Sequence, residues 1–424
     1  MSHRNSSLQP ISGRPLVILG ASVRALAESA QRAGWAVHAA DLFGDLDLAA
    51  AAREVVAVGA ENAANGYPES LRTAAQGFPT TAPWCYTGAI ENYPDLIDAI
   101  AATRPLAGNS GQIVKNLRDP AKLAAAGLAI PETRAASDGV PVDGTFLVKP
   151  LASGGGRGIR RWTPEVRARY TSLHEEGSPP RHVWQRLVAG TPASACYCVS
   201  AAGAELVGTS SQLIGEPWCH AGDFSWCGAV AELPLESTGF HDRHVQLERL
   251  GRILADQFHP IGLIGVDLVI DTSGHLHVIE VNPRPTASME LFERMGRVSI
   301  AGRHLEACGY VADADPQRAH AVPRVLPRAL PGVWAKAVLF MERATPVSDQ
   351  LVDALISTAT AWTQADGGWP ALADIPRPGQ SLAGGVPVVT VFAVGRTVCD
   401  CLSCLRGRVA HVDAILAAAR SPVG

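Results

Sequence analysis

The chain has 424 residues, 47% of them hydrophobic, and its 36 basic and 40 acidic residues give a net charge of −4. This composition is typical of a globular protein with two to four structural units. The nearly balanced charge argues against a nucleic-acid partner and against a polybasic membrane-binding role. No apolar run reaches the roughly 18 residues of a transmembrane helix, so no membrane association is expected.

The two ends of the chain carry different signals. Residues 1–14 are polar and predict a disordered tail without a secretory signal. The nine cysteines show no regular framework spacing, which indicates reduced thiols and a cytoplasmic protein. Near the C-terminus, Cys399, Cys401 and Cys404 form a Cys-x-Cys-x-x-Cys pattern that could bind zinc with His411 as a fourth ligand. The alternative is a strand end and helix start with buried free thiols.

Residues 15–111 alternate between strand and helix patterns. An apolar run at 16–19 is followed by a turn at Gly20, a helix with a small-residue face and a second strand that ends at Asp41. This order predicts a doubly wound α/β lobe. Asp41 stands where a dinucleotide-binding fold places its ribose acid, but the turn "GASVRA" lacks the full glycine pattern, which disfavours NAD binding.

The stretch "FLVKPLASGGGRGIRRW" (146–162) joins an apolar strand to a flexible, basic loop. Glycines allow backbone N–H groups to converge on a phosphate without Cβ clashes. The loop comprises Ser153, Gly154, Gly155, Gly156, Arg157 and Gly158. It is not a P-loop, because no Gly-Lys-Ser/Thr follows. Lys149 ends the strand within reach of such phosphates, and Lys115 is a second candidate cation.

The stretch "GVDLVIDTSGHLHVIEVNPRP" predicts a β-hairpin with its turn at 271–274. Alternation along the second strand puts Glu280 and Asn282 on one face, and hairpin pairing can bring Asp267 beside them. Three hard oxygen ligands on one face suit a magnesium ion that bridges two phosphates. Arg284 follows in the same alternating direction between two prolines, where a rigid arginine can clamp a carboxylate or stabilise a transferring phosphoryl group.

The order "FLVKP", "SGGGRG", "WQRLVAG", "GVDLVID" and "IEVNPRP" resembles the ATP-grasp superfamily, in its predicted ATP-dependent carboligase branch related to biotin carboxylase. The resemblance implies an α/β protein with the ATP-grasp fold. Residues 15–111 would form a Rossmann-like pre-ATP-grasp lobe, and 112–309 an ATP-grasp domain with a lid subdomain at about 120–187 and a metal-binding subdomain at about 188–309. A proline-rich linker (310–333) would lead to a small β-rich C-terminal domain (334–424). Within it, the stretch "DIPRPGQSLAGGVPVVTVFAVG" is similar to the small C-terminal β domain of biotin carboxylase-like members of the superfamily.

The resemblance also implies a chemistry. ATP would lie between two sheets, with Lys115 and Lys149 on its phosphates and the 153–158 loop over them. Asp267, Glu280 and Asn282 would hold Mg²⁺ or Mn²⁺. Adenine would be held by a hinge segment made of Gln185, Arg186, Leu187 and Val188. A small-molecule carboxylate would attack the γ-phosphorus to give an acyl-phosphate, which an amine then captures, with positioning and electrostatics supplying most of the catalysis. Lys149 and Arg284 are the expected catalytic residues, and a homodimer and a role in amino-acid or one-carbon cofactor biosynthesis are compatible with the family.

Some features leave alternatives open. Many family members carry a glutamate where Arg186 stands, which bears on side-chain contacts to the nucleotide. The loop at 213–230 contains His220 and Asp223 and is interpreted either as part of the substrate pocket or as a packed aromatic loop. Bicarbonate activation is a rival reaction, although no biotin-attachment Met-Lys-Met motif occurs. A nucleotide-binding protein without catalysis is the third possibility.

Overall fold

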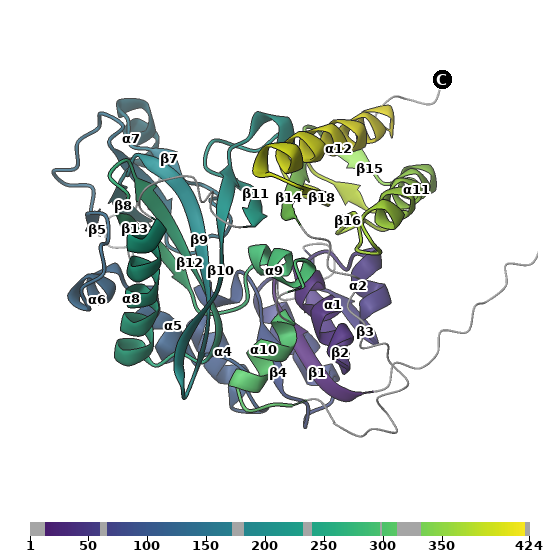
Figure 1. The fold of residues 1–424 in the computed structure, drawn as a ribbon, viewed down its shortest axis with the longest axis horizontal. Coiled ribbons are helices and arrows are strands. Elements are labelled where there is room, and N and C mark those ends of the chain that lie inside the picture. The colour runs from purple at the N-terminus through teal and green to yellow at the C-terminus, as the bar shows by residue number, and fades with distance from the viewer. Residues whose placement is uncertain are drawn as a thin grey trace, which may run out of the picture.

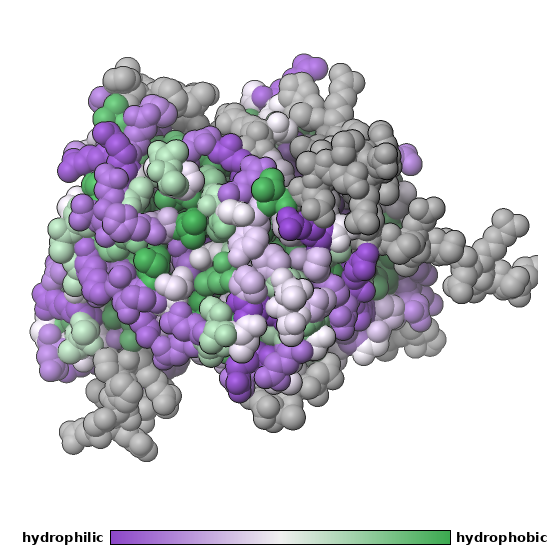
Figure 2. Space-filling model, turned by 90° about the horizontal axis from the view of Figure 1, so that it is seen from below, coloured by the Kyte–Doolittle hydropathy of each residue, from purple (hydrophilic) through white to green (hydrophobic). Residues whose placement is uncertain are grey.

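The computed structural model describes residues 13–59, 66–171, 182–231, 240–296, 299–311 and 332–419. Most of the predicted tail (1–14) and most of the predicted proline-rich linker (310–333) lie outside these residues, and Arg14 of the predicted tail begins the first strand. Within them, no helix combines the length and the apolar character needed to cross a bilayer. The face of the molecule in Figure 2 is largely hydrophilic, with apolar residues in small groups between polar ones.

The N-terminal lobe is a four-stranded parallel sheet in the order β3-β2-β1-β4, as the sequence predicts. Its elements are β1 (Arg14–Leu19), α1 (Arg24–Arg32), β2 (Trp35–Asp41), α2 (Leu46–Ala51), β3 (Glu54–Ala57), α3 (Glu69–Gly77), β4 (Trp84–Tyr86), the 3-10 helix η1 (Ile90–Asn92) and α4 (Pro94–Ala101). The chain reverses its winding between β1 and β4. In open α/β sheets ligands bind at this switch point, beyond the carboxyl ends of the strands.

Two short helices lead from this lobe into a small antiparallel sheet. They are α5 (Gly111–Leu117) and α6 (Pro120–Ala125), separated where Asp119 caps α6 and Pro120 begins it. The sheet has the order β5-β8-β6-β7 and consists of β5 (Thr133–Arg134), β6 (Phe146–Pro150), β7 (Arg160–Arg161) and β8 (His182–Arg186), with α7 (Pro164–Thr171) beside it. One face packs a small core around Phe146 and Trp184, and the opposite face carries Lys149 and Gln185.

The largest sheet has eight strands in the order β13-β12-β9-β10-β11-β14-β18-β16 (Figure 1). Its ATP-grasp part contains β9 (Gly190–Ser200), β10 (Gly203–Ile214), η2 (Pro217–Cys219), β11 (Trp226–Ala231), α8 (Phe240–Phe258), β12 (Gly262–Asp271), β13 (Leu276–Asn282), η3 (Ala287–Met289), α9 (Glu290–Arg294) and α10 (Ile300–Ala307). The helix α8 packs on this sheet through Leu247, Leu250 and Leu254.

The C-terminal segment extends the same sheet. It contains β14 (Val333–Phe340), β15 (Thr345–Pro346), α11 (Asp349–Ala365), β16 (Leu372–Ala373), β17 (Ser381–Leu382), β18 (Pro387–Gly395) and α12 (Val398–Ala419). Its strand β14 pairs with β11 of the ATP-grasp part, so this domain is built onto the central sheet. The expected β-rich character holds for β14 and β18, but the long helix α12 packs on both strands, and a second long helix, α11, packs on α12 and β16 (Figure 1).

The Cys-x-Cys-x-x-Cys pattern lies in the first turns of α12. Cys401 is buried against Leu405 in the core of this domain, whereas Cys399 is exposed. The ring of His411 packs against Trp362 at 5.5 Å. No group of three or more His, Cys, Asp or Glu side chains among the described residues could hold a metal ion. The zinc interpretation is therefore wrong for the described geometry, because the helix turns the thiols in different directions.

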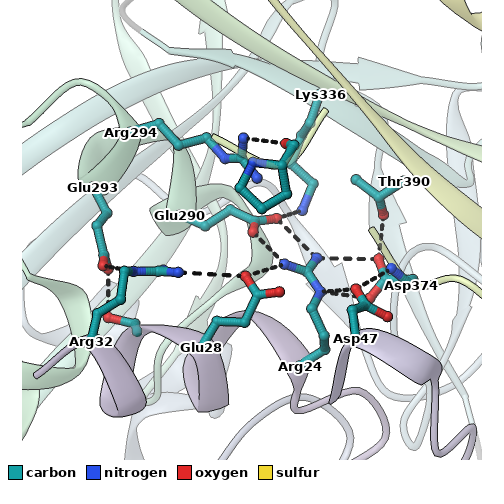
Figure 3. A network of polar contacts seen from close by, with 12 residues as sticks. Arg24, Glu28, Arg32, Asp47, Glu290, Glu293, Arg294, Lys336, Asp374 and Thr390 are labelled. Carbon is teal, nitrogen blue, oxygen red and sulfur yellow. Dashed lines mark hydrogen bonds and ion pairs between the residues drawn. The ribbon is translucent and has the colours of Figure 1, made fainter. Parts of the chain in front are cut away.

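A buried ionic cluster joins the three domains (Figure 3). Arg24 of α1 donates to Glu290 of α9 at 2.8 Å and to Asp374 of the C-terminal domain at 2.9 Å, and lies 3.5 Å from Asp47. Lys336 of β14 contacts the same Glu290. The Arg24 side chain is only 2% exposed, so its acidic partners compensate a charge that water cannot reach. We call these five residues the three-domain cluster.

Asp45 lies beside the three-domain cluster and should make stability depend on pH. Burial, followed by repulsion from Asp374, raises the pKa of Asp45 to about 9. The folded state therefore binds more protons than the unfolded state above about pH 4, and stability falls as pH rises through this range.

Replacing Asp45 with Asn is expected to raise the free energy of unfolding by about 1–3 kcal/mol near pH 8 and by much less near pH 5. Urea denaturation at the two pH values measures the difference. The exposed Asp256→Asn is the matched control and should have little effect at either pH. An Asp45→Asn effect that is equal at both pH values would contradict the assigned cause.

Candidate active site

The hairpin β12–β13 brings the three predicted metal ligands together. Asp267 pairs directly with Glu280, and Gly265 with Asn282, so the three functional side chains share one face. The Asn282 amide donates to Asp267 Oδ2 at 2.9 Å. The register that the alternating sequence pattern predicted is therefore confirmed, with an irregularity after Asp267.

Two carboxylates, Asp267 and Glu280, lie opposite each other on this face. Burial, followed by the charge of Glu280, raises the pKa of Asp267 to about 6, although the Gln212 amide donates to Asp267 at 2.6 Å and opposes that shift. Two carboxylates and an amide oxygen are the hard ligands that Mg²⁺ prefers. The donor set and the raised pKa both fit a site that a divalent cation would stabilise.

Lys149 lies across from the hairpin on the lid sheet. Its ammonium donates to Gln185 Oε1 at 3.0 Å, and the Gln185 amide lies 3.3 Å from Thr133 Oγ1. Burial lowers the pKa of Lys149, and attraction to Glu280 and then to Asp267 opposes the shift. The ammonium thus faces the metal-ligand face, as predicted. The Gln185 side chain accepts this hydrogen bond, and its expected contact with adenine stays a prediction.

Lys115, the second predicted cation, and its neighbour Arg118 contact different carboxylates. Lys115 of α5 is half-exposed and its ammonium lies 2.7 Å from Asp95, an exposed partner. Arg118, which follows the same helix, reaches the metal-ligand face, with Nη1 2.8 Å from Glu280 Oε1. Arg118, the residue at which α5 ends, is therefore the nearer cation to the hairpin, and a phosphate contact of Lys115 stays a prediction.

The glycine-rich loop rests on two other parts of the structure. The carbonyl of Gly155 accepts from the N–H of Trp226 at 3.0 Å, and the carbonyl of Ser153 accepts from the Asn92 amide of the N-terminal lobe at 3.2 Å. Gly155, Gly156 and Gly158 adopt left-handed backbone angles. Arg157 is exposed at the tip. The loop is therefore placed between the lobes, where a lid over a nucleotide is expected.

Gly156 tests the importance of this loop position. A Cβ at Gly156 would lie 1.8 Å from the carbonyl oxygen of Phe224, and the φ of 77° also disfavours alanine. Gly156→Ala is expected to displace the loop and weaken ADP binding by about tenfold, with a small change in stability. Gly154→Ala is the matched control, since nothing lies within 4 Å of its Cβ. Equal ADP affinities of the two variants by calorimetry would contradict a closed-loop role.

Backbone hydrogen bonds to two other segments of the same chain hold the hinge segment in place. The N–H groups of Arg186 and Leu187 donate to the carbonyls of Glu132 and Thr145. The Arg186 side chain pairs with Glu132 at 2.7 Å and lies over the ring of Phe146. The Arg186 side chain is therefore a half-exposed surface residue that pairs with Glu132. Adenine contacts from residues 185–188, Val188 included, stay a prediction.

Arg284 joins the hairpin to the N-terminal lobe. Its Nη2 lies 2.5 Å from Glu91 Oε1 and 3.2 Å from Asn282 Oδ1. Burial disfavours the charge, but Glu91 and then Glu280 outweigh it and hold the pKa of Arg284 above its ordinary value. Among the described residues, Arg284 Nε, Glu91 Oε2 and the Tyr67 hydroxyl are buried without a hydrogen-bond partner. Buried polar atoms without partners mark a place where a polar ligand would provide the missing hydrogen bonds.

Sequence reasoning missed Glu91. Its place in η1, just beyond the carboxyl end of β4, is at the topological switch point of the N-terminal sheet. A buried carboxylate at that point is a signal that the sequence alone could have provided. Asp41, at the end of β2, instead accepts from the N–H of Gly44 at 2.7 Å and so stabilises its own turn.

The two predicted substrate residues lie in the 215–226 loop. His220 Nε2 is 3.1 Å from Asp413 of α12, and its Nδ1 is 3.4 Å from Glu342. These contacts tie the loop to the C-terminal domain, so the structural interpretation of His220 is favoured over that of a catalytic base. Asp223 lies against Gly215 in the same loop, and a substrate role for it stays a prediction.

Comparison with known proteins agrees with this geometry. The family model of the ATP-grasp domain matches residues 117–288. No curated protein matches the chain. The solved carboxyaminoimidazole ribonucleotide synthase from Aspergillus clavatus, complexed with ATP, is similar at 14% identity and a TM-score of 0.66, covering 95% of this chain and 99% of that one.

Two further structures share the architecture. N5-carboxyaminoimidazole synthetase from Staphylococcus aureus, complexed with ADP, aligns at 15% identity and a TM-score of 0.61, covering 94% and 97% of the two chains. The biotin carboxylase domain of 2-oxoglutarate carboxylase from Hydrogenobacter thermophilus aligns at 12% identity and a TM-score of 0.60, covering 91% and 87%. These likenesses confirm the predicted fold over nearly the whole chain. Residues 117–288 therefore carry an ATP-grasp domain.

Proposed function

We propose that the protein is an ATP- and Mg²⁺-dependent ligase that activates a carboxylate as an acyl-phosphate and joins it to an amine, releasing ADP and phosphate. The proposal rests on one observation, which is that five functional side chains converge on one face of the hairpin. Asp267, Glu280 and Asn282 share a face of the hairpin, and the Lys149 ammonium and Arg118 guanidinium face the same place.

Each group has a role in this reaction. When bound at the hairpin, Mg²⁺ would neutralise phosphate oxygens and so favour attack on phosphorus. Lys149 and Arg118 would hold the phosphates by charge, and the N–H groups of the 153–158 loop would close over them. The loop would also exclude water, which protects an acyl-phosphate from hydrolysis. The protein itself forms no covalent bond with the substrate in this scheme.

The carboxylate substrate is proposed to bind at Arg284. The orphaned Nε of this arginine provides a donor next to the metal-ligand face. An arginine fixed by Glu91 would hold the attacking oxygen in line with the γ-phosphorus, which is where most of the rate enhancement arises. The amine would enter from the switch point of the N-terminal lobe, on the other side of Arg284.

Bicarbonate is a second candidate for the carboxylate. The orphaned atoms near Arg284 include a donor and the carboxylate oxygen of Glu91, and bicarbonate offers both oxygen acceptors and a hydroxyl donor. The 2-oxoglutarate carboxylase structure contains MgADP and bicarbonate. This candidate shares the same phosphoryl-transfer step and differs only in the substrate.

Release of ADP is the experiment that tests the proposal. The purified protein with MgATP is supplied with a panel of small carboxylates, or with bicarbonate, each with and without primary amines. Turnover that requires a carboxylate and an amine supports the ligase, and turnover that requires bicarbonate supports the second candidate. ATP binding without turnover across the panel would contradict both and favour a non-catalytic nucleotide-binding protein.

A further inference from the structure

Opposite charges balance around the hairpin when no metal is bound. Three carboxylates and three cationic side chains meet there, namely Asp267, Glu280, Glu91, Lys149, Arg118 and Arg284. Five of them come from the ATP-grasp domain or its entry helix. Glu91 alone comes from the N-terminal lobe, and its side chain is 2% exposed. A divalent cation would upset this balance by taking over Glu280, which is paired with Arg118.

Arg118 stands between two of these carboxylates. Its Nη1 lies 2.8 Å from Glu280 Oε1 and 3.9 Å from Glu91 Oε1. Its Nη2 donates to Asn92, the neighbour of Glu91, at 3.1 Å. A metal ion that binds Glu280 must displace Arg118, and a buried cation without a partner is costly. Glu91 is close enough to receive it, and Glu91 Oε2 is buried without a hydrogen-bond partner.

Arg284 depends on the same glutamate. Its guanidinium lies 2.5 Å from Glu91 Oε1, while Glu280 and Asp267 attract it from the opposite side. Without the Glu91 charge, the remaining anions near Arg284 are these two metal ligands. The arginine would then compete with a metal ion for them. Glu91 therefore restrains two arginines that would otherwise neutralise the metal site.

We infer that Glu91 is a positioning residue of the metal site, which holds Arg284 away from the two carboxylate ligands and receives Arg118 when a divalent cation takes Glu280. The inference rests on the proposed function, since it needs the metal at Asp267, Glu280 and Asn282. It makes metal binding in the ATP-grasp domain depend on a side chain of the N-terminal lobe. The Asn92 amide contacts both Arg118 and the Ser153 carbonyl. It therefore links the displacement of Arg118 by a divalent cation to the glycine-rich loop.

Binding of Mn²⁺ in the presence of saturating ADP, followed by electron paramagnetic resonance, tests the inference without any substrate. Glu91→Gln is expected to weaken Mn²⁺ binding by about tenfold, because the site gains one uncompensated positive charge. Binding of metal-free ADP should stay equal or become tighter, since the same charge favours an anion. Asp95→Asn, which removes an exposed carboxylate from the same lobe, is the control and should change neither.

Removing the displaced arginine provides the second arm. In an Arg118→Met background, the effect of Glu91→Gln on Mn²⁺ affinity should shrink to about threefold or less, because only Arg284 then remains to compete with the metal ion for the two carboxylates. Unchanged Mn²⁺ affinity in Glu91→Gln, or an equal loss in both backgrounds, would overturn the inference. The Glu280→Gln variant distinguishes a failure of the Glu91 inference from a failure of the proposed function. Full Mn²⁺ affinity in that variant would refute the proposed metal site itself.

Discussion

Replacing Glu280 with Gln is expected to lower the rate of ATP turnover by about a thousandfold or more. The change keeps the size of the side chain but removes one of two carboxylates from the metal-ligand face, where Asp267 and Asn282 alone would remain. The fold should persist, because the substitution also removes a repulsion that raises the pKa of Asp267. Steady-state ADP release in the presence of excess Mg²⁺ measures the loss.

Two comparisons make this prediction specific. Glu205→Gln, at an exposed glutamate of β10 that pairs with Arg303 of α10, should leave turnover unchanged. The variant protein should also unfold within about 1 kcal/mol of the wild type, which separates a chemical defect from a folding defect. Turnover within a few-fold of wild type in Glu280→Gln would remove the metal assignment and the mechanism built on it.

Arg24→Ala is expected to lower the free energy of unfolding by about 3–5 kcal/mol. Arg24 is the shared counter-ion of Glu290, Asp374 and Asp47, and its loss would leave buried carboxylates that repel one another. These carboxylates belong to three domains, so the variant should also loosen the contacts among them. Equilibrium urea denaturation measures the effect.

The controls for Arg24 separate charge from volume. Arg24→Met keeps much of the packing and should still lose most of the stability, since the carboxylates stay uncompensated. Arg72→Ala, at an exposed arginine that pairs with Glu69, should cost less than about 1 kcal/mol. An Arg24→Ala protein that unfolds within about 1 kcal/mol of wild type would show that the three-domain cluster does not stabilise the fold.

Local patterns predicted the parts of the site that lie on regular structure. The turn at 271–274 and the alternation on both of its flanks determine the pairing of Asp267 with Glu280, because a slip by one residue would turn every side chain to the other face. Lys149 follows from its position at the end of a buried strand. The same reasoning predicted the parallel N-terminal sheet and its order of elements.

Local sequence patterns could not predict contacts between segments that are far apart in the chain. Glu91 and Arg284 are 193 positions apart, and Arg24 and Asp374 are 350 apart, so nothing local pairs them. Arg118 was missed because a helix pattern does not show where the helix ends relative to a hairpin in another subdomain. The cysteine pattern in α12 failed for a related reason, since ligand spacing in a sequence is uninformative until the backbone conformation is known.

Transfer of oxygen-18 from the carboxylate substrate to phosphate tests the proposed reaction most directly. The labelled carboxylate, or labelled bicarbonate, that supports ADP release is used, and the released phosphate is analysed by mass spectrometry. An acyl-phosphate intermediate requires one oxygen of the substrate to leave with each phosphate, and we expect that label. Phosphate that takes its new oxygen from water while ADP is released would contradict the ligase mechanism.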